Sequence, residues 1–160
     1  MVHVPPMPHA LTNRDAAAVI DRLGLAPHPE GGWYKETWRP SAPDGSRRQA
    51  TAIHFLLERG QRSHWHKVLD ADEIWLWHAG MPLVLAMARD DAGPVSQTVL
   101  GPDIFAGQEP QVRIPAGWWQ AAEPVHDDAS CGWSLVSCVV APGFEFSSFE
   151  LAPPDWAPGC

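Results

Sequence analysis

The sequence predicts an all-β domain, a sandwich or barrel of short strands, with one helix near the N-terminus. From residue 33 onwards, short apolar segments follow one another with Gly, Pro or Asp between them, which is typical of antiparallel all-β folds. Proline is excluded from helix interiors, so 17 Pro among 160 residues favour strands and turns. Only one segment has apolar residues at convincing helical spacing. We therefore expect a single domain over residues 1–160.

The N-terminal part is predicted to be a loose arm over residues 1–10 followed by a helix over residues 12–24. Thr12 or Asn13 can cap the start of this helix, and Gly24 can end it. The apolar stripe of the helix consists of Ala16, Val19, Ile20 and Leu23.

Eight strands are predicted after a turn over residues 27–32. They lie at 33–39, 51–58, 63–68, 73–79, 83–89, 95–100, 111–114 and 133–140. The sandwich or barrel would then occupy residues 33–151, and the proline-rich tail over 152–160 would run across the surface.

Composition limits the partners and the compartment. A net charge of −8 opposes binding to nucleic acid or to an anionic membrane surface. Cys131, Cys138 and Cys160 are odd in number and form no CxxC pair, which fits a reducing compartment and apolar packing better than a disulfide scaffold. The first residues lack the features of a signal peptide, and no apolar run has the length of a membrane span. We expect a cytoplasmic protein without nucleic-acid or membrane partners.

Two histidines one residue apart are followed by a glutamate that opens the next apolar run. Because side chains alternate along a strand, His64 and His66 are expected to share one face and Trp65 to lie on the other. If the two strands pair, Glu73 can meet both imidazoles, and this is a ligand set of zinc and non-haem iron sites. His-x-His pairs also occur on exposed strand edges that bind nothing, so the spacing alone leaves both interpretations open.

These residues resemble the cupin superfamily, whose fold is a small antiparallel jelly roll. The first cupin motif is represented by Gly60, His64, His66, Glu73 and Gly80, with a longer gap between His66 and Glu73 than the family pattern has. The second motif, Pro-x-Gly-x-x-His, is represented by residues 115–120, where Gln120 replaces the histidine.

A closer similarity extends from the helix to residue 151. The strings at residues 28–34, 63–66, 72–75 and 142–144 are similar to a compact single-domain cupin branch of bacteria and fungi, largely without assigned function. The resemblance implies a cupin jelly-roll sandwich or barrel, a homodimer and a small-molecule ligand. Its fold neighbours include sugar-nucleotide epimerases, germin-like proteins and sugar isomerases.

The resemblance implies that His64, His66, Glu73 and Gln120 hold a divalent metal, either Zn, Ni, Fe or Mn, with positions left open for substrate. Glutamine is a weak ligand beside imidazole, although some metal-binding cupins use one. The alternative is a polar network in which Gln120 and Glu73 bond the two histidines. No organic cofactor is expected.

Acid–base candidates lie on the first two strands. Tyr34 and Glu36 share a face of the first strand and could reach the barrel mouth, or could lie on an exposed strand face. His54 lies in an apolar strand, opposite the face of Ile53 and Phe55, and is either a catalytic histidine or a core histidine bonded to a neighbour.

Substrate-binding candidates are mostly aromatic. Trp75 and Trp77 share the face of Glu73, and either Trp119 or its neighbour Trp118 can face inward; tryptophan could line a pocket or simply fill the core. Glu30 lies on the turn before the first strand, where loops often carry function.

Two functions remain open at this point. The first is a metal-dependent isomerase or epimerase acting on a sugar-like substrate, or a dioxygenase if the metal is iron. The second is a cupin that binds a small ligand without converting it. A ligand geometry with open positions would favour the enzyme, whereas a site closed by hydrogen bonds of Gln120 would favour the binding protein.

Overall fold

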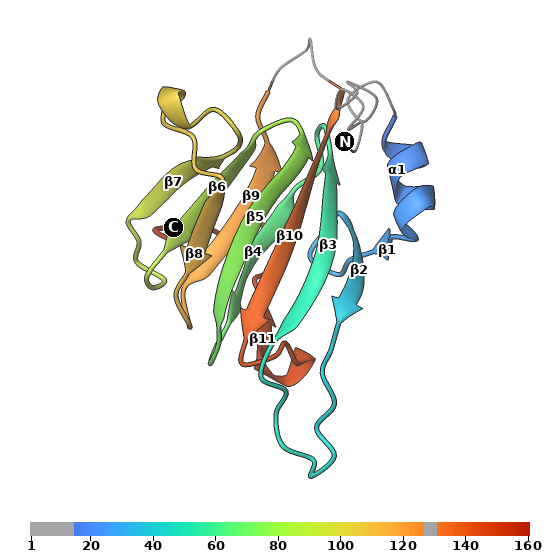
Figure 1. Cartoon of the computed structure of the whole chain (residues 1–160). Helices are drawn as coiled ribbons and strands as arrows, with labels where there is room; N and C mark the ends of the chain where they lie inside the picture. The colour runs from blue at the N-terminus through green and yellow to red at the C-terminus, as the bar shows by residue number, and fades with distance from the viewer. Residues whose placement is uncertain (1–14, 127–130) are drawn as a thin grey trace.

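Two antiparallel β-sheets pack face to face in the computed structural model, which describes residues 15–126 and 131–160 (Figure 1). The six-stranded sheet has the order β1 (Ala26–Pro27), β2 (Trp33–Trp38), β3 (Thr51–Glu58), β10 (Trp133–Ala141), β5 (Asp72–Gly80) and β8 (Gln111–Ile114). The five-stranded sheet has the order β11 (Phe149–Leu151), β4 (Ser63–Val68), β9 (Trp119–Pro124), β6 (Leu83–Ala88) and β7 (Val95–Leu100). The predicted sandwich with one N-terminal helix is confirmed.

The helix α1 (Ala16–Leu23) begins where Asp15 caps it, because the Asp15 carboxylate accepts a hydrogen bond from the Ala18 N–H. Asp15 has extended backbone, so the helix begins later than the predicted residue 12; Thr12, Asn13 and the arm lie outside the described residues. Gly24 ends the helix in the left-handed conformation, as predicted. Within residues 15–126 and 131–160, no helix is long and apolar enough to cross a bilayer.

Strand β9 is central to the five-stranded sheet, between β4 and β6, although its sequence does not predict a strand. Its residues include alanine, glutamate and proline, which are uncommon in strands. Burial compensates, because five of its six residues are buried. The short β1 and β11 and the 3₁₀ turns η1 (Ile104–Ala106) and η2 (Phe146–Ser148) were not predicted either.

The core fills one end of the space between the sheets and leaves the other end to the site. Phe55, Trp75, Leu85 and Val136 belong to the apolar cluster that packs between the sheets. On the outer face of the five-stranded sheet, Trp156 from the predicted surface tail packs on Trp119, with ring centroids 4.5 Å apart.

Candidate functional site

A bulge in β4 decides which of the two histidines faces the interior. Ser63 pairs with Ala122 and His66 pairs with Gln120, so three steps along β4 match two steps along β9. The extra residue breaks the alternation of side chains, and Ser63 and His66 both point inward. His64 turns away, and its Nε2 donates a hydrogen bond to the Pro153 carbonyl at 2.9 Å. The expectation that His64 and His66 share a face was wrong, because it assumed a regular strand.

The other two predicted metal ligands lie inside, but they do not complete a coordination sphere. The Gln120 side-chain oxygen, which would have to bind the metal, accepts a hydrogen bond of 2.7 Å from the Trp75 indole N–H. No three His, Cys, Asp or Glu side chains in the described part of the chain lie close enough together to hold a metal ion. The predicted set of His64, His66, Glu73 and Gln120 therefore does not fit a metal.

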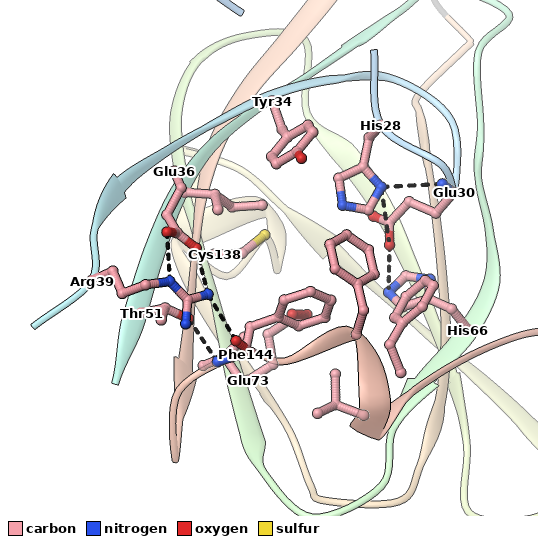
Figure 2. A pocket seen from close by; sticks show the side chains of 15 residues that line it. His28, Glu30, Tyr34, Glu36, Arg39, Thr51, His66, Glu73, Cys138 and Phe144 are labelled. Carbon is pink, nitrogen blue, oxygen red and sulfur yellow. Dashed lines mark hydrogen bonds and ion pairs between the residues drawn. The ribbon is translucent and has the colours of Figure 1, made fainter. Parts of the chain in front are cut away.

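A cavity of about 290 Å³ lies between the sheets, next to the apolar core (Figure 2). One part of its wall is polar and consists of His28, Glu30, His66 and Glu73. A second part is aromatic and consists of Tyr34, Phe144, Phe146 and Phe149. Such a combination of apolar walls with a few convergent polar groups is typical of small-molecule sites.

The turn before β2 brings Glu30 into the cavity wall. Gly31 has φ +103°, and a Cβ at this position would lie 2.2 Å from the Arg62 carbonyl oxygen, so only glycine lets the turn approach the loop before β4. The Glu30 carbonyl then accepts from the His64 N–H at 2.8 Å. The Glu30 side chain meets β4 as well, since its Oε1 accepts from the Ser63 hydroxyl at 2.9 Å.

Glu30 and His66 form a buried acid–imidazole pair, with Glu30 Oε2 and His66 Nε2 3.2 Å apart. His66 Nδ1 donates to the His64 carbonyl at 2.7 Å, and burial lowers the pKa of His66, so the ring is neutral with Nε2 as its acceptor. Burial raises the pKa of Glu30 to about 8, although the hydrogen bond from Ser63 opposes this rise. The raised pKa favours the protonated Glu30 carboxyl at neutral pH, and its Oε2 then faces the acceptor Nε2 of His66.

His28 stands beside this pair as a second neutral imidazole. Its Nδ1 accepts the Glu30 backbone N–H at 3.1 Å, so its proton is on Nε2. Burial, and then repulsion from His66, lower the pKa of His28 to about 4. The 3.7 Å approach of His28 Nδ1 to Glu30 Oε2 is therefore not an ion pair at neutral pH.

Glu73 is the second buried carboxyl of the cavity, and 7% of its surface is exposed. Burial raises the pKa of Glu73 to about 7. His66 opposes this rise and the neighbouring Glu30 increases it. Hydrogen bonding with Gln120 and Trp75 lowers the pKa by smaller amounts. Its Oε2 is buried and accepts no hydrogen bond from any described residue. This oxygen can receive a hydrogen bond from a ligand.

The three phenylalanines of the wall come from residues 142–149, which we name the flap because they connect β10 to β11 over the cavity. The Phe144 N–H donates to Thr51 Oγ1 at 2.9 Å, and the Phe144 carbonyl accepts from Arg39 at 2.8 Å. Arg39 also makes two hydrogen bonds, of 2.7 and 2.8 Å, to the Glu36 carboxylate (Figure 2). The flap is thus attached to β3 and to the end of β2.

The remaining predicted residues separate into two groups. Tyr34, Glu36 and Glu30 lie in the cavity wall. The others lie elsewhere. His54 is on the outer face of its sheet, with its ring centroid 6.4 Å from that of His78. Trp75 lies in the core and Trp77 packs against it, whereas Trp119 packs under the C-terminal tail. Trp75 and Trp77 do share the face of Glu73, as the alternation predicted. Along β5, however, Glu73 lies at the cavity, whereas Trp75 and Trp77 lie at the apolar core.

Several wall residues were missed as site residues. Thr51 in the wall and Ser63, which donates to Glu30, are small polar residues within strands, and no sequence signal distinguishes them from ordinary strand residues. Cys138 was interpreted as packing and does belong to the core cluster, but it also lines the cavity, where burial raises the pKa of its thiol. The three phenylalanines of the flap, Phe144, Phe146 and Phe149, line the cavity.

Comparison with solved structures places this fold among known relatives. A Shewanella oneidensis protein is 40% identical, with a TM-score of 0.78 over 87% of this chain and 85% of that one. A hypothetical protein from Leishmania major is 34% identical, also with a TM-score of 0.78, over 87% of this chain and 88% of that one. The Streptomyces nucleoside dehydratase Pac13 shares the fold alone, at 10% identity and a TM-score of 0.53 over 80% of this chain and 82% of that one.

No protein with a curated description matches the chain. The family described as cupin superfamily (DUF985) matches residues 17–152, which is most of the chain. Together with the two relatives above 30% identity, this match shows that the chain belongs to the DUF985 family of the cupin superfamily.

Proposed function

We propose that the protein is an acid–base enzyme of the isomerase or epimerase type that moves a proton on a small molecule held in the cavity. The observation that carries this proposal is the 3.2 Å contact between Glu30 Oε2 and His66 Nε2 inside a wall open to a ligand. General acid–base catalysis requires a proton that can be given and taken back near the working pH. Two buried groups that share one proton meet this requirement.

The contacts around the pair support defined roles. Ser63 and the His64 carbonyl fix the orientations of Glu30 and His66, and they are therefore positioning groups. Glu30 is the acid when it is protonated, and the proton returns to the Glu30–His66 pair at the end of a cycle. Glu73 supplies an acceptor for a polar group of the substrate. No step of this proposal requires the predicted metal, whose ligands do not converge.

Glu30→Gln tests this role because the Gln amide can still donate to His66 and accept from Ser63 but cannot transfer a proton. Molecules retained by the purified protein would be identified by native mass spectrometry and returned to it in D₂O. Wild-type protein should catalyse exchange of a substrate hydrogen or change the isomer. Glu30→Gln should bind within about threefold of wild type and lose roughly 100-fold or more of the exchange rate. The matched control is Glu150→Gln, which removes a carboxylate from β11 outside the cavity.

A second candidate function is a binding protein that does not convert its ligand. The hydrogen bond between Gln120 and Trp75 favours it, because closure by Gln120 is the feature expected of a cupin without a catalytic metal. The same experiment separates the two functions. The enzyme proposal is wrong if wild-type protein neither exchanges a hydrogen of any retained molecule with D₂O nor changes its isomer. It is also wrong if Glu30→Gln catalyses hydrogen exchange as fast as wild type.

A further inference from the structure

The cavity contains an acceptor oxygen that receives no hydrogen bond from any described residue. Glu73 extends from β5, between its neighbours Val140 on β10 and Ile114 on β8, and its buried Oε2 has no hydrogen-bond partner among the described residues. Burying an acceptor without a donor is unfavourable, so a ligand that supplies an N–H or O–H at this oxygen gains binding free energy.

The charges of the wall restrict which donor this can be. Among the described residues, no cationic side chain contacts the carboxyl groups of Glu30 and Glu73. His28 is neutral because its Nδ1 accepts a hydrogen bond, and burial lowers the pKa of His66 and so favours the neutral ring. The one guanidinium in the described wall, that of Arg39, is already held by both oxygens of Glu36 and by the Phe144 carbonyl. A cation would be attracted by Glu73, which ionises near neutral pH, whereas an anionic ligand would meet this carboxylate and no unpaired cationic side chain among the described wall residues.

The flap adds aromatic rings to this environment. Phe144, Phe146 and Phe149 contact one another edge to face, with centroids 5.0 to 6.0 Å apart, and all three line the cavity. Aromatic rings attract organic cations and also pack against apolar groups. Carboxyl groups at one side and phenyl rings at another suit a molecule with a cationic end and an apolar body.

We propose that the ligand of this cavity is an organic ammonium, a protonated amine with an apolar body, whose N–H donates to Glu73 while the apolar body packs against the flap. This inference rests on the proposed small-molecule site and adds its ligand class. Glu73 is the specificity residue, and the Glu30–His66 pair stays free for proton transfer.

Three probes of one shape test the charge preference: benzylammonium, benzyl alcohol and benzoate, each measured at pH 7 by calorimetry and ligand-observed NMR. Wild-type protein should bind benzylammonium at least tenfold more tightly than benzyl alcohol and should bind benzoate least. In Glu73→Gln the affinity for benzylammonium should fall to that for benzyl alcohol. Benzyl alcohol should still bind, which would show that the cavity is intact. Glu73→Asp should keep the preference, and so should Glu150→Gln, which removes one negative charge outside the cavity.

Equal affinities of wild-type protein for benzylammonium and benzyl alcohol would overturn the inference, as would no detectable benzylammonium binding. A preference that survives in Glu73→Gln would overturn it as well. These outcomes differ from those of the turnover experiment. If the protein prefers ammonium but shows no turnover, the enzyme proposal is wrong and the proposed ligand class stands. If it shows turnover without this preference, the ligand class is wrong and the enzyme proposal stands.

Discussion

Glu30 and Glu73 titrate at unusual values because each carboxyl lies in a buried wall. In the folded protein their pKa values are about 8 and about 7, well above the ordinary carboxyl value of 4.5. Between the ordinary and the raised pKa of each group, the folded state holds more protons than the unfolded state. The stabilisation that these two groups contribute is therefore fully present below the ordinary pKa and is lost as the pH rises through the folded pKa. His28, with a folded pKa of about 4, and His66, whose pKa burial also lowers, act in the opposite direction, but mainly below their ordinary value of 6.5.

We therefore expect the free energy of unfolding to fall between pH 6.5 and pH 8.5, where only the two carboxyl groups act. Glu30 should contribute about 2 kcal/mol of this loss, or roughly 4–8 °C in Tm. Thermal unfolding measured across this range should show a clearly smaller slope for Glu30→Gln, while Glu150→Gln keeps the wild-type slope. A Tm that does not change with pH in wild-type protein would contradict the raised pKa values.

The two histidines of β4 should respond differently to mutation and to metal. His64 contacts the Pro153 carbonyl on the surface side of the sheet, so His64→Ala should leave Zn²⁺ and Ni²⁺ titrations of metal-free protein unchanged. It should cost about 1 kcal/mol of stability through one lost hydrogen bond. Calorimetric titration of both proteins checks this. If His64→Ala abolished tight metal binding, the predicted ligand set would be restored.

At the level of single residues, the sequence predicted part of the site. The motif identified His66 and Glu73 as inward residues, and the turn identified Glu30. It could not show the bulge between Ser63 and His66, because an extra residue in a strand depends on pairing with β9. That pairing is a tertiary property, and β9 itself has no strand-like composition.

The flap is the element that covers the cavity, and several hydrogen bonds attach it, among them those of Phe144 with Thr51 and of Gly143 with Arg48. Thr51→Val keeps a good strand residue in β3 but removes the acceptor of the Phe144 N–H. We expect the flap to become less protected, because an unsatisfied N–H costs about 1–3 kcal/mol. Hydrogen exchange followed by mass spectrometry should show faster exchange in residues 142–149 and no change in β9. Equal protection of the flap in both proteins would mean that this contact does not hold it.

Elements with a clear pattern were predicted well, and elements that depend on burial were not. The bounds predicted for β3, β4, β7 and β8 agree with the structure, since apolar residues and turn residues mark both ends. The end of α1 at Gly24 was predicted from its residue type, but the cap at Asp15 was not, because Thr12 and Asn13 offered equal capping chemistry. Strand β9 is held by its neighbours on both sides, which no local pattern reveals.

At the scale of the whole molecule, the C-terminal tail stabilises the sandwich from outside. Trp156 covers Trp119 on the outer face of the five-stranded sheet, away from the cavity. Trp156→Ala should lower the free energy of unfolding by roughly 1–3 kcal/mol without changing the affinity for cavity ligands. Chemical denaturation provides the measurement, and Trp38→Ala, at a side chain that is 50% exposed, should change it by only about 0.5 kcal/mol. Equal losses in the two variants would show that the tail contributes nothing specific.

The position of the flap along the chain has a consequence for biosynthesis. Every other wall residue, from His28 to Val140, precedes the three phenylalanines that cover the cavity. Because the ribosome makes the chain from the N-terminus, the walls leave the exit tunnel before the cover does. A nascent chain can build the pocket but cannot enclose a guest in it, so ligand capture should wait until synthesis has passed Phe149.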